Sequence, residues 1–439
     1  MASLDIYKNT KKVLDSISPS MCFAKWKQTT LYLQTGENSS CHLPAPHLIP
    51  LDELKNNPSA LHNTVYKKLQ QKDMLEGKRP AECGYCWRVH DSSEEVYNDR
   101  ITKSSDYWAL PFKDEIIQKG TEDINPSYLE VSFSNVCNLK CGYCNPFVSS
   151  KYMEEIKQFG PYPTSTNFNA LGNKKVYLER EHNPYVEAFW KWWPDLYKDL
   201  SVFRITGGEP LLSKHTFKVL DWIIENPNPN LELNINSNLS VPDDLIIKFI
   251  EKIQYILDNN LVKSFTLYTS CEAYGSKAEY IRFGLNFDKW LQNCELFLSS
   301  VDKARLSIMS AYNALSVTSF IEFAKEIKKL KDKYSAGRVG IDVPFVRKPD
   351  HLSVFILTDS LVEVIKSHVE YFESNFDFYE INRMKKVYTV AKNTKIDNRS
   401  VARVDFCKFI DEHDRRRGTD FFNTFPELEQ FYYTCLKPS

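Results

Sequence analysis

Three cysteines stand close together in one short stretch of the chain. Cys137, Cys141 and Cys144 lie within V-S-F-S-N-V-C-N-L-K-C-G-Y-C-N, which gives the spacing C-x3-C-x2-C. Thiols at this spacing can bind three irons of an iron–sulfur cube, whose fourth iron then has no protein ligand. An open coordination position is typical of catalytic metal sites, whereas structural sites are closed. A zinc loop, or three unrelated buried cysteines, is the alternative interpretation.

A pair of glycines followed by a carboxylate is the second candidate for chemistry. Gly207, Gly208, Glu209 and Pro210 follow a strand predicted over Ser201–Thr206. Two glycines at the end of a strand allow a ligand to approach the backbone closely. An ordinary turn from a strand into a helix is the alternative.

Four further cysteines form two pairs near the N-terminus. Cys22 and Cys41 flank a predicted strand, Thr29–Thr35, and a predicted hairpin turn at G-E-N-S-S. Cys83 and Cys86 form a C-x2-C pair. Four thiolates can close a zinc site or bind a second iron–sulfur cube, and the sequence leaves both metals open.

Strands and helices alternate along the middle of the chain and must position these residues. Strands are predicted over Tyr128–Phe133, Ser201–Thr206, Leu231–Asn236, Ser264–Thr269, Ala304–Met309 and Val339–Phe345. Helical spacing of apolar residues separates the later strands, so the pattern predicts a parallel α/β sheet with right-handed crossovers. Ligands bind such sheets at the carboxyl ends of the strands, where both motifs lie.

The helix predicted over Phe320–Tyr334 has the clearest local signals. Ser319 and Glu322 are spaced as a capping box, and Gly337 is predicted to end the helix.

Polar residues close two more strands of the predicted sheet. Asn236 and Ser237 end the third strand, and Ser270 ends the fourth. These short side chains can hydrogen-bond the hydroxyl groups of a ribose, although Asn and Ser are also common in plain turns.

Together the first two motifs resemble the signature of the radical S-adenosylmethionine (SAM) enzymes. The resemblance implies a partial (β/α)6 barrel, with a [4Fe-4S] cluster on Cys137, Cys141 and Cys144 whose open iron binds SAM. It also implies reductive cleavage of SAM to a 5′-deoxyadenosyl radical, which abstracts a hydrogen atom from the substrate. By the same resemblance Tyr143 lies at the cofactor, and the G-G-E-P element accepts hydrogen bonds from the SAM amino group. Arg282, in the stretch E-Y-I-R-F-G, would pair with the SAM carboxylate.

The N-terminal cysteines resemble the auxiliary-cluster motif of twitch and SPASM domains. Cys22, Gly36 and Cys41 are spaced C-x13-G-x4-C, and the C-x2-C pair follows. The resemblance implies a second, auxiliary [4Fe-4S] cluster on Cys22, Cys41, Cys83 and Cys86, which would carry electrons. One departure is position, because twitch domains more often follow the barrel, whereas this one precedes it.

The resemblance leads to one expected function with two alternatives. We expect a radical SAM enzyme that modifies a peptide or protein, with a reductant such as flavodoxin or ferredoxin. The first alternative is oxidation or rearrangement of a small molecule, such as a sugar or nucleotide. An alternative of another class is a non-catalytic, metal-stabilised binding protein.

Length and composition bound the organisation of the chain. Its 439 residues predict a twitch-like domain at 1–120, the barrel at 121–345 and a mainly helical extension at 346–439. The charge of −1, from 56 basic and 57 acidic residues, gives no expectation of nucleic-acid binding. Eleven cysteines, with no signal-peptide pattern and no membrane-length apolar run, predict a cytoplasmic, reducing compartment. Charged residues at 411–417 predict a solvated helix end or interdomain ion pairs, and a contact point for a charged substrate is the alternative.

Overall fold

A nine-stranded sheet lies at the centre of the computed structural model, which describes residues 4–42, 44–92, 97–393 and 399–437. The strand order is β11-β10-β8-β7-β6-β4-β1-β2-β3. The strands are β1 Gln28–Tyr32, β2 Glu37–Ser39, β3 His47–Leu48, β4 Tyr128–Ser132, β6 Val202–Thr206, β7 Asn228–Ser237, β8 Val262–Ser270, β10 Arg305–Met309 and β11 Val339–Asp342. The strands from β11 to β1 pair in parallel, and β2 and β3 add an antiparallel edge. The six predicted strands and their parallel arrangement are therefore confirmed.

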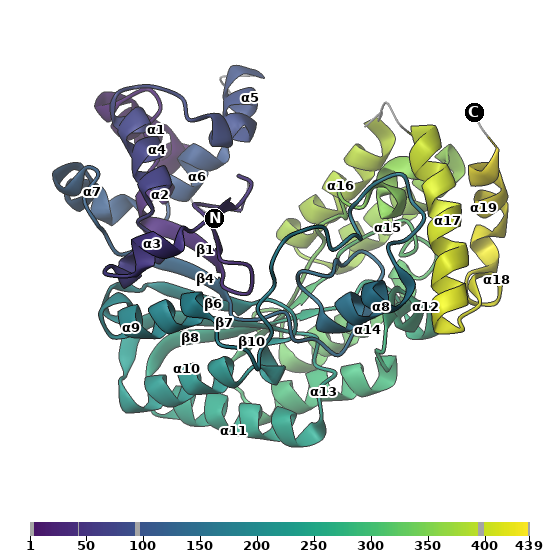
Figure 1. Ribbon diagram of the computed structural model, residues 1–439. Coiled ribbons are helices and arrows are strands. Elements are labelled where there is room, and N and C mark those ends of the chain that lie inside the picture. The colour runs from purple at the N-terminus through teal and green to yellow at the C-terminus, as the bar shows by residue number, and fades with distance from the viewer. Residues whose placement is uncertain (1–3, 43, 93–96, 394–398, 438–439) are drawn as a thin grey trace.

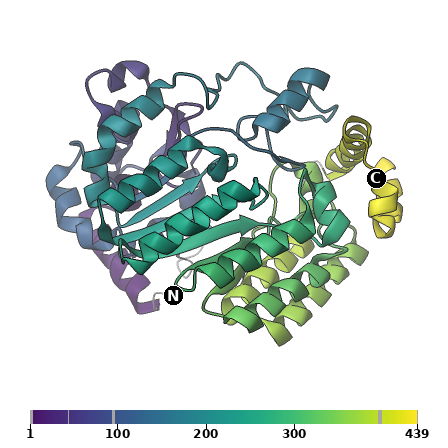
Figure 2. The same cartoon turned by 90° about the horizontal axis from the view of Figure 1, so that it is seen from below.

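One face of this sheet is apolar and packs against helices. Alternate residues point to the same face of a strand. On this face lie Leu129, Val131, Phe203, Ile205, Leu233, Ile235, Phe265, Leu267, Leu306, Ile308, Val339 and Ile341, all at most 2% exposed. The covering helices are α9 Pro184–Asp199, α10 Lys214–Glu225, α11 Asp243–Asp258, α13 Phe287–Ser300 and α14 Phe320–Tyr334 (Figure 2). Burial of this face forms the main hydrophobic core.

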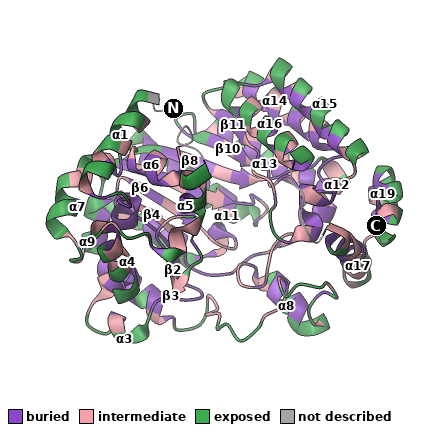
Figure 3. Ribbon diagram, turned by 90° about the horizontal axis from the view of Figure 1, so that it is seen from above, coloured by how far each residue is buried: buried purple, intermediate pink, exposed green. Residues whose placement is uncertain are grey.

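The other face of the sheet is polar. It carries Glu130, Ser132, Arg204, Thr206, Asn234, Asn236, Thr266, Tyr268, Ser270, Arg305, Ser307, Met309, Gly340 and Asp342. A parallel sheet buried by helices on both faces normally has apolar residues on both. Figure 3 looks toward this polar face, between the N-terminal helices and the C-terminal ones. The polar side chains of this face can therefore contact polar groups of a ligand or of other parts of the chain.

The N-terminal segment has its own small core but shares the central sheet. Its helices are α1 Leu4–Ile17, α2 Ala24–Lys27, α3 Leu51–Leu54, α4 Val65–Leu75, α5 Gly84–Ser92, α6 Asp99–Ser104 and α7 Lys113–Lys119. Leu14, Phe23 and Trp26 belong to a separate hydrophobic cluster. Strand β1, however, pairs with β4 along its whole length, so the sheet continues across residue 120.

The C-terminal segment is helical, as expected, and stands at the opposite end of the sheet (Figure 1). Its helices are α15 Asp359–Asn375, α16 Phe378–Asn393, α17 Arg399–Arg417, α18 Phe421–Thr424 and α19 Glu429–Leu436. Two further helices, α8 Ser150–Phe159 and α12 Gly275–Ile281, and a two-stranded sheet of β5 Lys140–Cys141 and β9 Arg282–Phe283, lie near the carboxyl ends of the strands. No helix of the described ranges is both long and apolar enough to cross a lipid bilayer.

Three local predictions were wrong. The turn between β1 and β2 occupies residues 33–36, and E-N-S belongs to strand β2, because these residues pair with β1. Ser319 does not cap α14, since its hydroxyl instead accepts a hydrogen bond from the backbone N–H of Tyr274 at 3.3 Å. The helix ends before Gly337, because Ser335 already takes a left-handed φ of 80°.

Candidate active site

The three central cysteines lie on a loop that leaves the carboxyl end of β4. We call residues 133–149 the cysteine loop. Its backbone is held by serines, since Ser150 Oγ accepts from the Cys137 N–H at 3.1 Å and Ser149 Oγ donates to the Leu139 carbonyl at 2.8 Å. The same two serines begin helix α8, so the loop is fixed to the helix that follows it.

A short antiparallel ladder places Arg282 beside Cys141. These two residues are partners in the β5–β9 pair, and the Gly142 N–H donates to the Ile281 carbonyl at 2.8 Å. Arg282 Nη1 lies 3.8 Å from Cys141 Sγ. A guanidinium at this distance favours the thiolate form of the cysteine, which is the form that binds a metal.

Most of the predicted site residues line one cavity of about 320 Å³. The predicted residues in its wall are Cys137, Cys141, Tyr143, Cys144, Gly207, Gly208, Pro210, Asn236, Ser237, Ser270 and Arg282. We call it the cysteine cavity. The lining residues come from the ends of four strands and from β9. The volume of the cavity falls in the range of small-molecule sites. Glu209 is the one predicted residue of this group that does not line the cavity.

The two glycines allow close approach of the cysteine loop as well as an open cavity. A Cβ on Gly208 would lie 2.2 Å from the Val136 carbonyl oxygen. Gly207 has a φ of +124°, and a Cβ there would lie 2.6 Å from Ser132 Oγ. The Glu209 N–H donates to the same Val136 carbonyl at 2.6 Å. Glycine is therefore required here because two backbone segments touch.

The Glu209 carboxylate is turned into the protein and joins two strand ends. Its Oε1 accepts from Ser237 Oγ at 2.8 Å and from the Leu211 N–H at 3.0 Å. Its Oε2 accepts from the Asn238 N–H at 2.6 Å. Burial raises the pKa of Glu209 to about 7, although these three donors oppose the shift. Contact of this carboxylate with a cofactor stays a prediction.

Arg282 is paired with a carboxylate that the sequence did not mark as a cofactor residue. Glu272 accepts from Arg282 Nε at 3.0 Å and from Nη2 at 2.6 Å. The Tyr143 hydroxyl donates to the same carboxylate at 3.1 Å. Burial raises the pKa of Glu272, and Arg282 opposes that shift. The only sequence signal for Glu272 is its position just after strand β8.

The thiols of the cysteine loop are desolvated. Burial raises the pKa of Cys137 to about 12 and also raises the pKa of Cys141 and of Cys144. A thiol with a raised pKa keeps its proton until a metal displaces it. Three such thiols beside a cavity fit an iron–sulfur cluster with one iron open to a ligand.

Helix α17 holds the cysteine loop from the C-terminal side. Arg417 Nη1 donates to the Lys140 carbonyl at 2.7 Å, and its Nε and Nη2 each lie 3.0 Å from the Glu155 carboxylate. Lys140 Nζ lies 2.7 Å from Glu155. Burial would raise the pKa of Glu155, but Arg417 prevails and lowers it to about 2. Of the residues at 411–417, Arg417 therefore forms a buried ion pair with Glu155, whereas contact of this stretch with a charged substrate stays a prediction.

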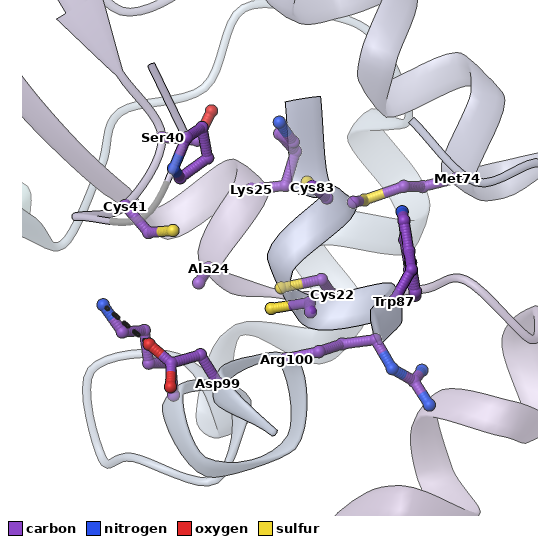
Figure 4. Close-up of a pocket in the computed structure, with 13 residues that line it drawn as sticks. Cys22, Ala24, Lys25, Ser40, Cys41, Met74, Cys83, Trp87, Asp99 and Arg100 are labelled. Atoms are coloured by element: carbon purple, nitrogen blue, oxygen red, sulfur yellow. Dashed lines mark ion pairs between the residues drawn. The ribbon is translucent and has the colours of Figure 1, made fainter. Parts of the chain in front are cut away.

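The four N-terminal cysteines line a second, smaller cavity. Figure 4 shows Cys22, Cys41 and Cys83 around one space, and Cys86 belongs to the same wall. We call it the four-cysteine cavity. Burial raises the pKa of Cys83 to about 11 and that of Cys86 to about 12. The sequence motif therefore brings four thiols to the wall of one cavity.

Three cations surround these thiols. Lys25 and Arg100 are 2% and 1% exposed, and both line the four-cysteine cavity together with Lys103. Each of these cations is already paired with a carboxylate, Lys25 with Glu82, Arg100 with Asp15 and Lys103 with Asp99, so they give no independent indication of an anionic metal–thiolate group. Within the described residues, no three His, Cys, Asp or Glu side chains are arranged around the position of a single metal ion. Each cysteine of a cube binds a different iron, so a cube does not need that convergence.

Comparisons with known proteins give limited information. No family model matches the chain, and no curated protein matches it. Two similar solved structures are Streptococcus suis SuiB bound to S-adenosylmethionine and SuiB bound to the precursor peptide SuiA, each with a TM-score of 0.38 and 16% identity. The alignments cover 72% and 71% of this chain but only 62% and 61% of SuiB. Likeness at this level identifies neither a fold family nor an activity.

Proposed function

We propose that this chain is a radical SAM enzyme whose [4Fe-4S] cluster is held by Cys137, Cys141 and Cys144. The observation that carries the proposal is the cysteine cavity itself. Three thiols, a glycine pair and a buried arginine come from separate strand ends and line one space of about 320 Å³. A cluster with an open iron and a zwitterionic cofactor needs such a combination of soft ligands and polar groups.

The residues of the cavity have distinct roles in this proposal. The backbone at Gly207 and Gly208 receives the SAM amino group, and Arg282 receives the SAM carboxylate. Asn236 and Ser237 hydrogen-bond the ribose, helped by Ser270. When bound, the cluster and SAM supply a 5′-deoxyadenosyl radical that abstracts a hydrogen atom from the substrate.

Glu272 and Tyr143 orient the arginine. With Nε and Nη2 bound to Glu272, the Arg282 plane is fixed and Nη1 remains beside Cys141. The guanidinium can then meet an anionic group without first reorganising. The buried Glu272 also offsets the charge of Arg282 while the cavity holds no anion.

The four-cysteine cavity holds an auxiliary [4Fe-4S] cluster in this proposal, with zinc as the alternative. Full ligation by Cys22, Cys41, Cys83 and Cys86 leaves no open iron, so the group would transfer electrons. The proposal keeps a twitch-like segment at 1–120, a partial (β/α)6 barrel at 121–345 and a helical extension at 346–439. A flavodoxin or ferredoxin in the cytoplasm supplies the electron.

A peptide or protein is the favoured substrate, and a small molecule such as a sugar or nucleotide is the alternative. The polar face of the sheet supports a substrate rich in hydrogen-bonding groups, which suits either choice. Because the chain aligns with less than two thirds of SuiB, the substrate is argued from this face alone.

The test is iron content together with SAM cleavage under anaerobic, reducing conditions. Wild type is expected to hold about eight irons and to form 5′-deoxyadenosine, since two cubes carry four irons each. Replacing Cys137, Cys141 and Cys144 by Ala is expected to leave about four irons and no 5′-deoxyadenosine. The matched control is Cys294→Ala, a buried cysteine in helix α13 outside both cavities, which is expected to behave as wild type.

Three other outcomes separate the alternatives. About four irons falling to none, with one zinc per chain, would place zinc in the four-cysteine cavity. Full iron without SAM cleavage would favour the non-catalytic binding protein. Unchanged iron in the triple variant would overturn the cluster assignment itself.

A further inference from the structure

Two charged side chains face each other on the polar face of the sheet, outside the cysteine cavity. Arg204 is in β6 and Glu130 is opposite it in the neighbouring strand β4. Arg204 Nε and Glu130 Oε2 lie 3.7 Å apart, and the side chains are 19% and 13% exposed. This separation makes an ion pair but is too long for a hydrogen bond.

The hydrogen-bonding capacity of this pair is largely unused. Arg204 Nε donates to Asn236 Oδ1 at 3.0 Å, and the Tyr128 hydroxyl interacts with the same guanidinium. Across the described ranges, no donor hydrogen-bonds the Glu130 carboxylate. A mostly buried carboxylate without hydrogen bonds is costly, so the unsatisfied Glu130 calls for an explanation such as a ligand that supplies a donor.

Arg204 is held in a fixed orientation. Its guanidinium carbon lies 4.3 Å from the centre of the Tyr268 ring, which is a stacking distance. The bond to Asn236 fixes the Nε edge of the same group. The two terminal nitrogens are therefore held in a plane set by the protein, which favours two-point binding of an anion.

Arg204 borders open space that adjoins the cysteine cavity, and Glu130, whose side chain is 13% exposed, lies behind it at the ion-pair distance. Arg204 and Tyr268 line a cavity of about 490 Å³ over the polar face. Met309 lines both this cavity and the cysteine cavity, and Asn236 belongs to the wall of the latter. A ligand bound to Arg204 would thus be separated from the proposed SAM site by the side chain of Met309, which lines both cavities.

The charges define the chemical class of the ligand. A planar carboxylate matches the fork of Arg204, whereas a phosphate dianion would meet the negative charge of Glu130. Glu130 in turn accepts a hydrogen-bond donor of the same ligand, best an ammonium. We propose that Arg204 and Glu130 bind the substrate through a carboxylate and a neighbouring ammonium group. That the ligand is the substrate of the enzyme rests on the proposed function, whereas the existence of the binding site does not.

Ligand-detected NMR with small probes tests the site on the reconstituted full chain without reductant. The probes are glycylglycine, which carries both groups, N-acetylglycine, which carries only the carboxylate, and glycinamide, which carries only the ammonium. Arg204→Gln is expected to weaken glycylglycine and N-acetylglycine about tenfold, because a charge-assisted pair is lost. Glu130→Gln is expected to weaken glycylglycine and glycinamide but not N-acetylglycine. Arg347→Gln, an exposed arginine that lines neither of the two cavities, is the matched control with less than about a twofold effect.

Three results would overturn the proposal. They are absence of binding of any probe to wild type, an equal effect of Arg347→Gln, and competition by inorganic phosphate as strong as that by glycylglycine. A wild-type protein that binds the probes but does not cleave SAM would instead overturn the proposed function alone.

Discussion

Arg282, in the wall of the cysteine cavity, forms a two-point ion pair with the buried Glu272, with Nη2 2.6 Å from Oε2 and Nε 3.0 Å from the same oxygen. The side chains are 6% and 0% exposed. Arg282 is also the ladder partner of Cys141. The ion pair therefore connects the end of β8 to the cysteine loop, and its loss should destabilise both segments.

Replacing Glu272 by Gln is expected to lower the free energy of unfolding by about 3–5 kcal/mol, because it leaves a buried guanidinium without its counter-charge. Urea unfolding of the metal-free protein measures this change. Glu295→Gln is the control, since Glu295 pairs with Lys333 on the surface and should change stability by less than about 0.5 kcal/mol. Equal effects of the two variants would contradict the importance of the buried pair.

Gly208→Ala is expected to displace the cysteine loop, because the new Cβ would lie 2.2 Å from a backbone oxygen that has little freedom to move. The expected results are a loss of about 1–3 kcal/mol in stability and failure to load the central cluster. Thermal unfolding and iron per chain are the measurements. Gly337→Ala is a matched control, because a Cβ there would meet nothing within 4 Å. A Gly208→Ala protein with full iron would show that the loop yields easily.

Arg417→Gln is expected to loosen the cysteine loop from the C-terminal side. It removes the donor to the Lys140 carbonyl and leaves Glu155 without its main counter-charge. Hydrogen exchange at residues 139–145 should become at least about tenfold faster, since local opening costs less. Arg415→Gln, whose side chain is 56% exposed, is the control and should leave these amides unchanged. Unchanged exchange in Arg417→Gln would mean that α17 does not restrain the loop.

Glu209 should make the stability of the metal-free protein depend on pH. Its pKa is about 7 in the folded chain, above its ordinary value of 4.5, so the folded state binds the proton more tightly than the unfolded state. Its stabilising contribution is therefore complete below pH 4.5 and is lost as the pH rises through 7. Between pH 4 and pH 8 the wild type should lose about 3 kcal/mol more than Glu209→Gln. Urea unfolding of both proteins at both pH values measures this difference. Equal losses of stability in wild type and Glu209→Gln would show that the three donors keep Glu209 ionised.

The parallel sheet and the grouping of the cysteines into two clusters could be predicted because their signals are local. Alternation within strands such as V-F-R-I-T and the spacing of cysteines need only neighbouring residues. The same alternation places Arg204 on the polar face of the sheet, because it stands between two buried apolar residues of β6. Its meaning became clear only when neighbouring strands aligned Arg204 with Glu130.

Other features depend on contacts between distant parts of the chain. Arg417 reaches Glu155 across 262 residues, and no local pattern marks that pair. Gly208 looks like a ligand-binding glycine, but the nearest atoms to its missing Cβ belong to the cysteine loop. The capping prediction at Ser319 failed for the same reason, because a tertiary hydrogen bond from Tyr274 replaced the local one.

The pairing of β1 with β4 has a consequence for the two cysteine sites. Strand β1 lies between Cys22 and Cys41, and β4 leads directly into the loop with Cys137. Five consecutive residue pairs join these strands, from Gln28–Tyr128 to Tyr32–Ser132. One hydrogen-bonded ladder therefore joins the segment between Cys22 and Cys41 to the strand that precedes Cys137, and in the proposed function this ladder would set the distance that an electron crosses between the two clusters.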